Sequence, residues 1–436
     1  MWDLKEKLWE IRDPIYGFIE INEWERDIIN HPIFQRLRRI RQLAFTDLVY
    51  PGAVHTRFEH SLGVMHVATK VFDNIASECK DMLRSEYGLN EDGLNKVRTI
   101  IRLAALLHDV GHAPFSHAGE SIMPYKDNGK LYKHEDYSSA IIKTVFKELI
   151  EDHKLNNNYD IKAEEVAAFV VKDYKVLKKF FFWVDIISGQ VDADRIDYLL
   201  RDSYHIGVQY GIFDLKRLLK TIVIVKTEDR PILGFKEGGL HVAESLILAR
   251  YYMFTQVYFH HTRRAYDHHI ANAIREILLK LNYNDGKLKP PNNEENIKDY
   301  LEWDDWKVGN LIKENKELYD CEKILNREHD RCVYHTNEVP DIDDLKKFDD
   351  IYHSISCEID ECFVDEAEKS FYNIGNDDIK ILKEDESGEI VVRSLSELSN
   401  VVNNIKTVRQ KRIYVPLIFQ EKAINILKKE GLYSGE

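Results

Sequence analysis

The stretch LLHDVGHAPFSH, from Leu106 to His117, gathers three histidines and an aspartate at the end of an apolar run. Ionisable side chains are costly to bury unless they are paired, hydrogen-bonded or bound to a metal. Imidazole and carboxylate ligands suit Mn, Fe, Zn, Ni or Mg, and a divalent ion lowers the pKa of a coordinated water enough for attack on a phosphate ester. The stretch is therefore a candidate for part of a metal centre, and pairing or hydrogen bonding of its side chains are the alternatives.

Two ligands do not make a metal site, so further donors must come from elsewhere in the chain. His108 and Asp109 fall in a predicted helix that ends at Val110, where their side chains point about 100° apart and can reach one ion. Two other stretches, HTRFEHSLG and VDADRIDYLLRD, supply donors of both kinds: His55, His60, Asp192 and Asp194. An HD dipeptide alone has little weight, because such pairs occur by chance in most long proteins.

Mainly helical elements must position these residues. A helical period of apolar residues begins near Pro32, in PIFQRLRRIRQL, and recurs in six further segments: Glu59–Glu86, Glu91–Val110, Tyr137–Ile150, Ala163–Lys172, Ile187–Ser203 and Val242–Leu281. Alternating patterns predict short hairpins at Ile11–Ile21 and Thr221–Phe235, and strands at Glu389–Arg393 and Arg412–Val415. The Gly-, Pro- and Asn-rich loop Tyr283–Asn296 suggests a boundary between domains at residues 1–283 and 284–436.

The composition excludes some classes of partner. The chain has 436 residues, enough for more than one domain, and a formal net charge of −14. Broad nucleic-acid binding depends on Lys and Arg at phosphates, so we do not expect it as the main role. Five cysteines without a CxxC pair, a charged N-terminus and no apolar run long enough to cross a bilayer predict a cytoplasmic protein without a membrane span.

Four motifs follow one another in the order HTRFEHSLGV, LLHDVGHAPFSH, KHEDYS and VDADRIDYLLRD. This order resembles the HD phosphohydrolase superfamily, and within it the deoxynucleoside triphosphate triphosphohydrolases, both bacterial dGTPase-like proteins and the eukaryotic enzyme with a sterile-alpha-motif and an HD domain. The resemblance implies a mainly α fold, with an all-helical HD core, short β-hairpins and a smaller mixed α/β C-terminal lobe. It also implies one divalent metal ion held by His60, His108, Asp109 and Asp194.

The resemblance assigns catalytic roles to neighbouring side chains. His134, in KHEDYS, matches the family's catalytic histidine and is expected to protonate the leaving ester oxygen, with His112, His117 and Glu120 completing the network. His112 lies one helical turn after His108, and the Ala-Pro that follows should end the helix so that His117 comes from a loop. Without the resemblance, His117 and His134 would fit a role in capping or bridging loops equally well.

The resemblance also implies how a deoxynucleotide would be held. Arg57, Arg195 and Tyr198 would contact phosphates, Gln42 and Asp202 would hydrogen-bond the sugar 3′-hydroxyl, and Leu43 and Tyr266 would close the space that a ribose 2′-hydroxyl needs. Two departures from the eukaryotic enzyme are Asp267, where it has Gln, and Tyr258, where it has a phosphate-contacting Arg. Selection for deoxyribose is therefore expected, while base preference stays open.

Two basic segments are candidates for an activator site. Gln35 and Arg38, in FQRLRRIRQ, match residues that recognise a guanine activator at subunit contacts, and KTVRQKRIYVP contributes Arg409, Lys411 and Arg412. The resemblance implies a dNTP or GTP activator, a homo-tetramer or at least a dimer, and Mg accompanying the nucleotide. The alternatives are a solvated helix face and an edge strand protected by its charges.

These observations favour one hypothesis over two others. The leading hypothesis is metal-dependent, nucleotide-activated hydrolysis of a dNTP to deoxynucleoside and triphosphate. A different HD phosphohydrolase or phosphodiesterase, acting on a cyclic or alarmone nucleotide, is the alternative within enzymes. A nucleotide-sensing or single-stranded nucleic-acid-binding module is the alternative outside them.

Overall fold

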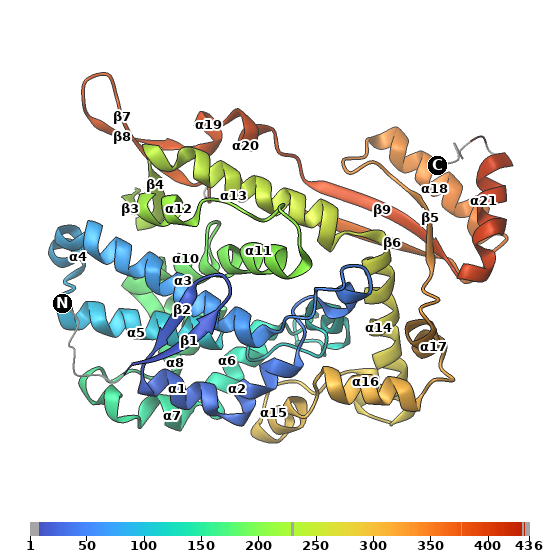
Figure 1. Ribbon diagram of the computed structural model, residues 1–436, viewed down its shortest axis with the longest axis horizontal. Helices are drawn as coiled ribbons and strands as arrows, with labels where there is room; N and C mark the ends of the chain where they lie inside the picture. The colour runs from blue at the N-terminus through green and yellow to red at the C-terminus, as the bar shows by residue number, and fades with distance from the viewer. Residues whose placement is uncertain (1–7, 228–230, 376, 430, 432–436) are drawn as a thin grey trace.

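Figure 1 shows the computed structural model, which describes residues 8–227, 231–375, 377–429 and 431. The first two thirds of the chain form a body of packed helices: α1 (Glu23–Asn30), α2 (Pro32–Gln35), α3 (Arg57–Glu78), α4 (Lys80–Tyr87), α5 (Glu91–Leu107), α6 (His134–Thr144), α7 (Lys147–Glu151), α8 (Ala163–Val171), α9 (Tyr174–Leu177), α10 (Asp185–Ser188), α11 (Ala193–Ile206), α12 (Leu215–Thr221), α13 (Leu240–Met253) and α14 (His261–Lys280). The expected mainly helical fold is confirmed.

Helices α3 and α5 form the centre of this body. Every residue from Ile101 to Leu107 of α5 is buried, as expected of a helix that is enclosed on all sides. Helix α3 begins with a capping box, in which Thr56 and Glu59 satisfy each other's backbone N–H groups. The first turn of α3 meets the end of α5, so the two helices are antiparallel and bring their motifs together.

Helix α11 packs against α3 at a close approach that requires glycine. A Cβ atom at Gly63 would lie 1.9 Å from Asp197 Oδ1 and 2.4 Å from Arg201 Nη2. The side chain of Asp192 caps α11 by accepting a hydrogen bond from the Arg195 N–H, 2.7 Å away. The HSLG and VDADRID motifs are therefore complementary parts of one contact between helices.

Nine strands form three small sheets among the described residues: β1 (Trp9–Asp13) and β2 (Gly17–Ile21); β3 (Ile222–Lys226), β4 (Pro231–Lys236), β7 (Lys380–Glu384) and β8 (Ile390–Ser394); and β5 (Arg331–His335), β9 (Val408–Val415) and β6 (Phe363–Lys369). Both predicted hairpins and both predicted strands are confirmed. Strand β7 pairs in parallel with β4, so the C-terminal chain returns to the helical body.

The remaining helices are α15 (Glu294–Leu301), α16 (Asp305–Glu314), α17 (Tyr319–Asn326), α18 (Ile342–Ser356), α19 (Leu395–Leu398), α20 (Asn400–Asn404) and α21 (Gln420–Lys429). Helices α15 to α17 pack on α6 and α14 and share the main hydrophobic core. A second, smaller core joins α18, α21 and β9, at the upper right of Figure 1. The division at residue 283 stays a prediction.

Six predicted helices differ in extent from the structure. The segment 59–86 is divided at Cys79 into α3 and α4, and the segment 137–150 is divided at 145–146 into α6 and α7. The helix from Pro32 ends at Arg39, because the extended Ile40–Gln42 segment pairs instead with His55–Arg57. The segment 187–203 is interrupted by Gly189–Asp192, and 242–281 by a π-helical turn at 254–258. Helix α5 ends at Leu107 rather than Val110, so His112 is not on it.

No helix in the described part of the chain is long and apolar enough to span a bilayer.

Candidate metal centre and active site

The expected metal ligands converge from three helices. His60 lies in the first turn of α3, His108 and Asp109 directly follow α5, and Asp194 lies in the first turn of α11. Ligand atoms of His60, His108 and Asp109 lie within 4.8 Å of one another. Asp194 Oδ1 is 3.1 Å from His60 Nε2 and 4.0 Å from His108 Nε2. The structure therefore brings all four side chains to one point.

The two imidazoles, His60 and His108, are each oriented by a hydrogen bond at the ring nitrogen Nδ1. His60 Nδ1 donates to Asp197 Oδ2 at 2.8 Å, and His108 Nδ1 donates to the Ala105 carbonyl at 2.7 Å. Both Nε2 atoms thus face the carboxylates, are buried, and make no well-formed hydrogen bond with the residues described. Two nitrogens and two carboxylates so arranged fit one divalent cation, without selecting among Mn, Fe, Zn, Ni and Mg.

The charges around His60 favour a cation at its Nε2. Burial alone would lower the pKa of His60, yet the carboxylates of Asp194 and Asp197 raise it to about 10. Burial would raise the pKa of Asp194, but His60 holds it at about 2. A metal ion competes with the second proton of His60 for this position, so metal binding should release a proton.

A second layer of buried residues holds His60 in place. Asp197 accepts hydrogen bonds from Tyr16 Oη and Arg201 Nε, both at 2.8 Å, in addition to His60. Arg201 Nη1 also pairs with Asp13 Oδ2 at 3.0 Å. The β1–β2 hairpin thereby supports the metal centre. Sequence reasoning missed this network, although the spacing of Asp197 and Arg201, four residues apart on one helix, was a signal for their pairing.

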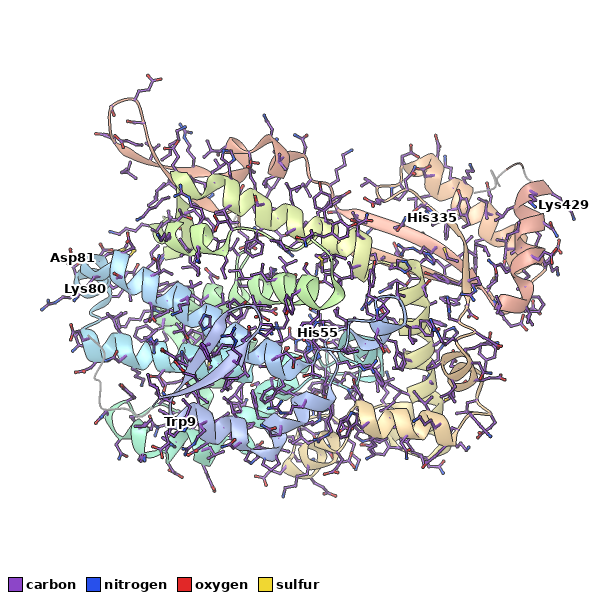
Figure 2. All side chains as sticks on the ribbon, in the orientation of Figure 1. Trp9, His55, Lys80, Asp81, His335 and Lys429 are labelled. Carbon is purple, nitrogen blue, oxygen red and sulfur yellow. The ribbon has the colours of Figure 1, made fainter. Side chains whose placement is uncertain are left out.

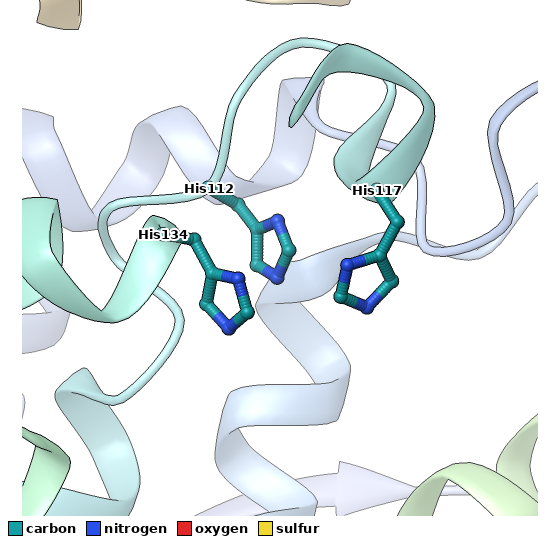
Figure 3. Close-up of side chains that lie close together, drawn as sticks. All are labelled: His112, His117 and His134. Atoms are coloured by element: carbon teal, nitrogen blue, oxygen red, sulfur yellow. The ribbon is translucent and has the colours of Figure 1, made fainter. Parts of the chain in front are cut away.

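Three histidines lie together, as Figure 3 shows, and His134 Nε2 is 3.9 Å from Oδ1 of the metal-ligand candidate Asp109. His112 follows the end of α5, His117 lies in a 3-10 helix (Ser116–Ile122) rather than a loop, and His134 begins α6. The rings of His112 and His134 are stacked at 3.9 Å, and His117 stands across from both. A Cβ at Gly111 would lie 2.2 Å from Ser138 N, so glycine permits this approach of the loop to α6.

The pKa values of His134 and His112 are shifted in opposite directions, and Glu120 is the partner that raises that of His134. It accepts a hydrogen bond from His134 Nδ1 at 2.5 Å and lies 3.2 Å from His117 Nδ1. Although burial lowers it, the pKa of His134 is raised overall because Glu120 stabilises the imidazolium. Burial and the Arg57 charge hold the pKa of His112 well below its usual value. The site thus pairs an imidazole that holds its proton more tightly than usual with one that holds it less tightly.

The three histidines also have the proximity of a metal-binding group. However, the planes of His112 and His134 are only 15° apart, so their lone pairs run side by side instead of meeting at one point. His134 is moreover already engaged by Glu120. The arrangement fits proton transfer better than a second metal ion.

Arg57 is the phosphate-binding candidate nearest the metal ligands. Its Nη1 is 2.7 Å from Asp109 Oδ2, and its Nε donates to Ser116 Oγ at 2.9 Å. Arg195 follows Asp194 but turns to Asp192 and the Gly189 carbonyl.

Tyr198 lies beside another buried cation. The charge of Arg250 lowers the pKa of Tyr198, although burial raises that pKa overall. Arg250 was not predicted from the sequence, because a single arginine in the long period of 242–281 looks like an ordinary helix residue.

His55 brings together the two residues expected to bind the sugar. Its backbone carbonyl accepts from the Gln42 N–H at 3.0 Å, and its Nε2 is 2.8 Å from Asp202 Oδ1. Tyr258 Oη donates to Asp202 Oδ2 at 2.6 Å. Gln42 Oε1 is buried without a hydrogen-bond partner among the residues described. Figure 2 labels His55 near the middle of the molecule.

The two residues expected to exclude a 2′-hydroxyl are both buried. Leu43 is 7% exposed and Tyr266 is 1% exposed. The Tyr266 ring packs 4.8 Å from His329 and 6.3 Å from Phe45, measured between ring centroids. Neither side chain can move aside without disturbing the main core.

The activator candidates lie on separate elements. Arg38 is exposed, donates to Gln35 Oε1 at 2.8 Å and stacks on Phe58. On β9, Arg409 is exposed and pairs with Glu368. Lys411 points to the same side of the strand, with its Nζ 5.7 Å from the centre of the Phe348 ring.

Arg412 is placed differently from its neighbours on β9. It is buried, and its Nη2 donates to the Phe259 carbonyl at 2.7 Å. Among the residues that the structure describes, no hydrogen bond or ion pair joins Gln35 or Arg38 to Arg409, Lys411 or Arg412. The two basic segments therefore do not form one site within a single chain by direct contact.

Comparison with known protein families gives two matches. Residues 57–201 match the HD domain, and residues 213–426 match the HD associated region. The two matched segments contain the metal ligands and most of the C-terminal lobe.

Individual relatives agree with these matches. An uncharacterized protein of Methanocaldococcus jannaschii is 39% identical over 62% of this chain and 50% of its own length. The deoxynucleoside triphosphate triphosphohydrolase SAMHD1 homolog of Dictyostelium discoideum is 30% identical over 74% of this chain and 59% of its own. The chain thus spans only half or slightly more of these relatives. A hypothetical protein from Aquifex aeolicus has a similar structure, with a TM-score of 0.76, 29% identity, and coverage of 97% of this chain and 100% of that one.

Proposed function

The chain belongs to the HD-domain phosphohydrolase family, and from that premise we propose that it cleaves deoxynucleoside triphosphates into a deoxynucleoside and intact triphosphate. The single observation that carries the proposal is the meeting of four metal-ligand side chains with a charged His134–Glu120 pair and the guanidinium of Arg57. These are the parts that hydrolysis of a phosphate ester needs: a cation site, a proton donor and an anchor for phosphate. The relative named for dNTP triphosphohydrolase activity supports the choice of substrate.

His60, His108, Asp109 and Asp194 would hold the divalent ion. When bound, the ion lowers the pKa of water and offsets phosphate charge. Arg57 holds the α-phosphate near Asp109. The water oxygen bonds to the α-phosphorus and releases one proton to solvent, and the bond from that phosphorus to the sugar 5′-oxygen breaks. His134 donates its proton to the departing 5′-oxygen, which leaves as the deoxynucleoside hydroxyl.

The neighbours of His134 keep it ready for this step. Glu120 stabilises the imidazolium before the transfer, and neutral His112 stacks on it without competing for the proton. His117 faces Glu120 from the exposed side.

Selection for deoxyribose would follow from the buried surroundings of the sugar. Gln42 and Asp202, joined through His55, would hydrogen-bond the 3′-hydroxyl. Leu43 and Tyr266 would leave no space for a 2′-hydroxyl. Arg195 and Tyr198 would bind the outer phosphates, with Mg accompanying the nucleotide.

Regulation and assembly are part of the same proposal. A dNTP or GTP activator would bind between chains, using Gln35 and Arg38 from one basic segment and Arg409, Lys411 and Arg412 from the other. A homo-oligomer, at least a dimer and in the expected form a tetramer, would bring the basic segments of different chains together around the activator.

Chromatography of products tests the reaction. Protein loaded with each divalent metal is incubated with each dNTP, alone and in mixtures, and Asp109→Ala serves as the control. Deoxynucleoside with intact triphosphate, absent for the variant, supports the proposal, and faster turnover in mixtures supports an activator site. Cleavage of cyclic or alarmone nucleotides with no turnover of any dNTP would replace the proposal by the other enzymatic class.

A further inference from the structure

A cavity of about 460 Å³ lies next to the metal centre but separate from it. Its walls come from the segment around α10, the start of α11, the β3–β4 hairpin, α13 and the chain after β6. None of the four metal ligands lines it. Arg195, which follows Asp194 directly, is the link between the two sites. The volume lies within the usual range for pockets that bind small molecules.

One end of the cavity is strongly basic. Arg195, Arg250 and Lys369 all line it, and they come from α11, α13 and β6. Arg195 is paired with Asp192. Arg250 is 4% exposed; its Nη1 donates to the Phe371 carbonyl at 2.7 Å, but its Nε is buried with no hydrogen-bond partner within the described residues.

Lys369 is also without a counter-ion. Its Nζ stands 4.8 Å from the centre of the Phe254 ring, and within the described ranges no carboxylate lies in ion-pair distance of it. Burial and the charges of Arg250 and Arg195 lower the pKa of Lys369 to about 8. Burial also lowers the pKa of Arg250. Cations held together in this way are stabilised by an anion, and the cavity provides the space for one.

The rest of the cavity suits an aromatic or apolar group. Phe181, Ile232, Leu233, Phe235 and Phe371 line it. Three aspartates, Asp185, Asp377 and Asp378, also line the wall, and Asp378 accepts hydrogen bonds from Tyr372 and Ser396. Gln190 closes one side by hydrogen-bonding the backbone of Asn373 and Asp377. A basic end combined with an apolar wall matches a phosphate group attached to a flat or apolar body.

We propose that this cavity binds a small phosphorylated molecule of the nucleotide class, with phosphate at Arg250 and Lys369 and the body against Leu233 and the surrounding phenylalanines. The same phosphate chemistry has two sources. A separate nucleotide can fill the whole cavity, or the outer phosphates of a molecule bound at the metal centre can extend past Arg195 to the basic end alone. Neither form depends on whether the metal centre hydrolyses dNTPs.

Calorimetric titration of the full chain with ATP and with inorganic triphosphate tests the proposal. Lys369→Gln removes one charge at similar size, and Lys369→Arg keeps it. Leu233→Trp fills the apolar wall without changing the basic end. Lys383→Gln, on β7 outside the cavity, is the matched control. Melting temperatures confirm that each variant is folded.

We expect Lys369→Gln to weaken triphosphate and ATP binding about tenfold, as loss of a charge-assisted contact does, while Lys369→Arg and Lys383→Gln bind like the parent. If Leu233→Trp weakens only ATP, the cavity holds its own nucleotide. If it weakens neither probe, the phosphates reach the basic end from the metal centre. Unchanged binding of both probes by Lys369→Gln and Leu233→Trp alike, in folded protein, would overturn the proposal.

Discussion

Replacement of Asp197 by Asn would test how the second layer of residues controls the metal centre. Asp197 accepts from His60 Nδ1, Tyr16 Oη and two nitrogens of Arg201, all between 2.8 and 3.0 Å. An asparagine offers one oxygen and one NH₂ group, so its NH₂ must face donors on one side. Either His60 or Tyr16 then loses its acceptor, and Arg201 keeps only Asp13 as a counter-ion.

Two effects of this variant follow from the geometry. Removing one partner of a buried ion pair costs about 3–5 kcal/mol, so the free energy of unfolding measured with urea should fall by that amount. Loss of the partner that orients a metal-bound histidine lowers metal affinity about 10- to 100-fold, which titration with Mn²⁺ in competition with a chelator measures.

Asp73→Asn is the matched control. It breaks the ion pair of Asp73 with Arg98, 2.7 Å apart on the partly exposed side of α3, and should change the free energy of unfolding by less than about 1 kcal/mol. Its Mn²⁺ affinity should equal that of the parent. Folded Asp197→Asn protein with an Mn²⁺ affinity within about twofold of the parent would refute the positioning role.

Three further predictions concern the active site. His134 can donate a proton only when it is protonated, so activity should fall as the pH rises through the pKa of His134. Glu120→Gln removes the charge that raises this pKa. The alkaline limb of the kcat profile should therefore move to lower pH. His134→Gln should lower kcat by about 10²- to 10⁴-fold with little change in KM, and an unchanged kcat would exclude it as the acid. Leu43→Ala should raise kcat/KM for ribonucleotides relative to kcat/KM for deoxyribonucleotides, and a constant ratio would contradict the steric argument. The same substitution should lower the free energy of unfolding, measured by thermal unfolding, by about 2–5 kcal/mol.

The helical fold could be predicted because its apolar period is long and regular. Helix α5 was predicted within three residues of its end, whereas the predicted helix Glu59–Glu86 covers both α3 and α4 and misses the break at Cys79. The end of the helix at Arg39 could not be predicted: the pairing of Ile40–Gln42 with His55–Arg57 is a tertiary contact that overrides a local helical period. The same contact places Gln42 beside His55.

The candidate site was predictable where a motif names its residues. The four ligands and the three histidines stand in short, recognisable stretches, and the structure brings each set together. Asp197, Arg250 and Lys369 stand outside any such pattern. The roles of Asp197 and Arg250 depend on which helices pack together, and the role of Lys369 depends on where β6 meets the helical body. The local spacing of residues in the sequence predicts neither kind of contact.

Hydrolysis in water enriched in ¹⁸O tests the central claim most directly. With a dNTP as substrate and metal-loaded protein, mass spectrometry of the products shows which bond is broken. We expect one ¹⁸O atom in intact triphosphate and none in the deoxynucleoside, because water attacks the α-phosphorus. Label in the deoxynucleoside hydroxyl, or in monophosphate or pyrophosphate without labelled triphosphate, would contradict the proposed reaction.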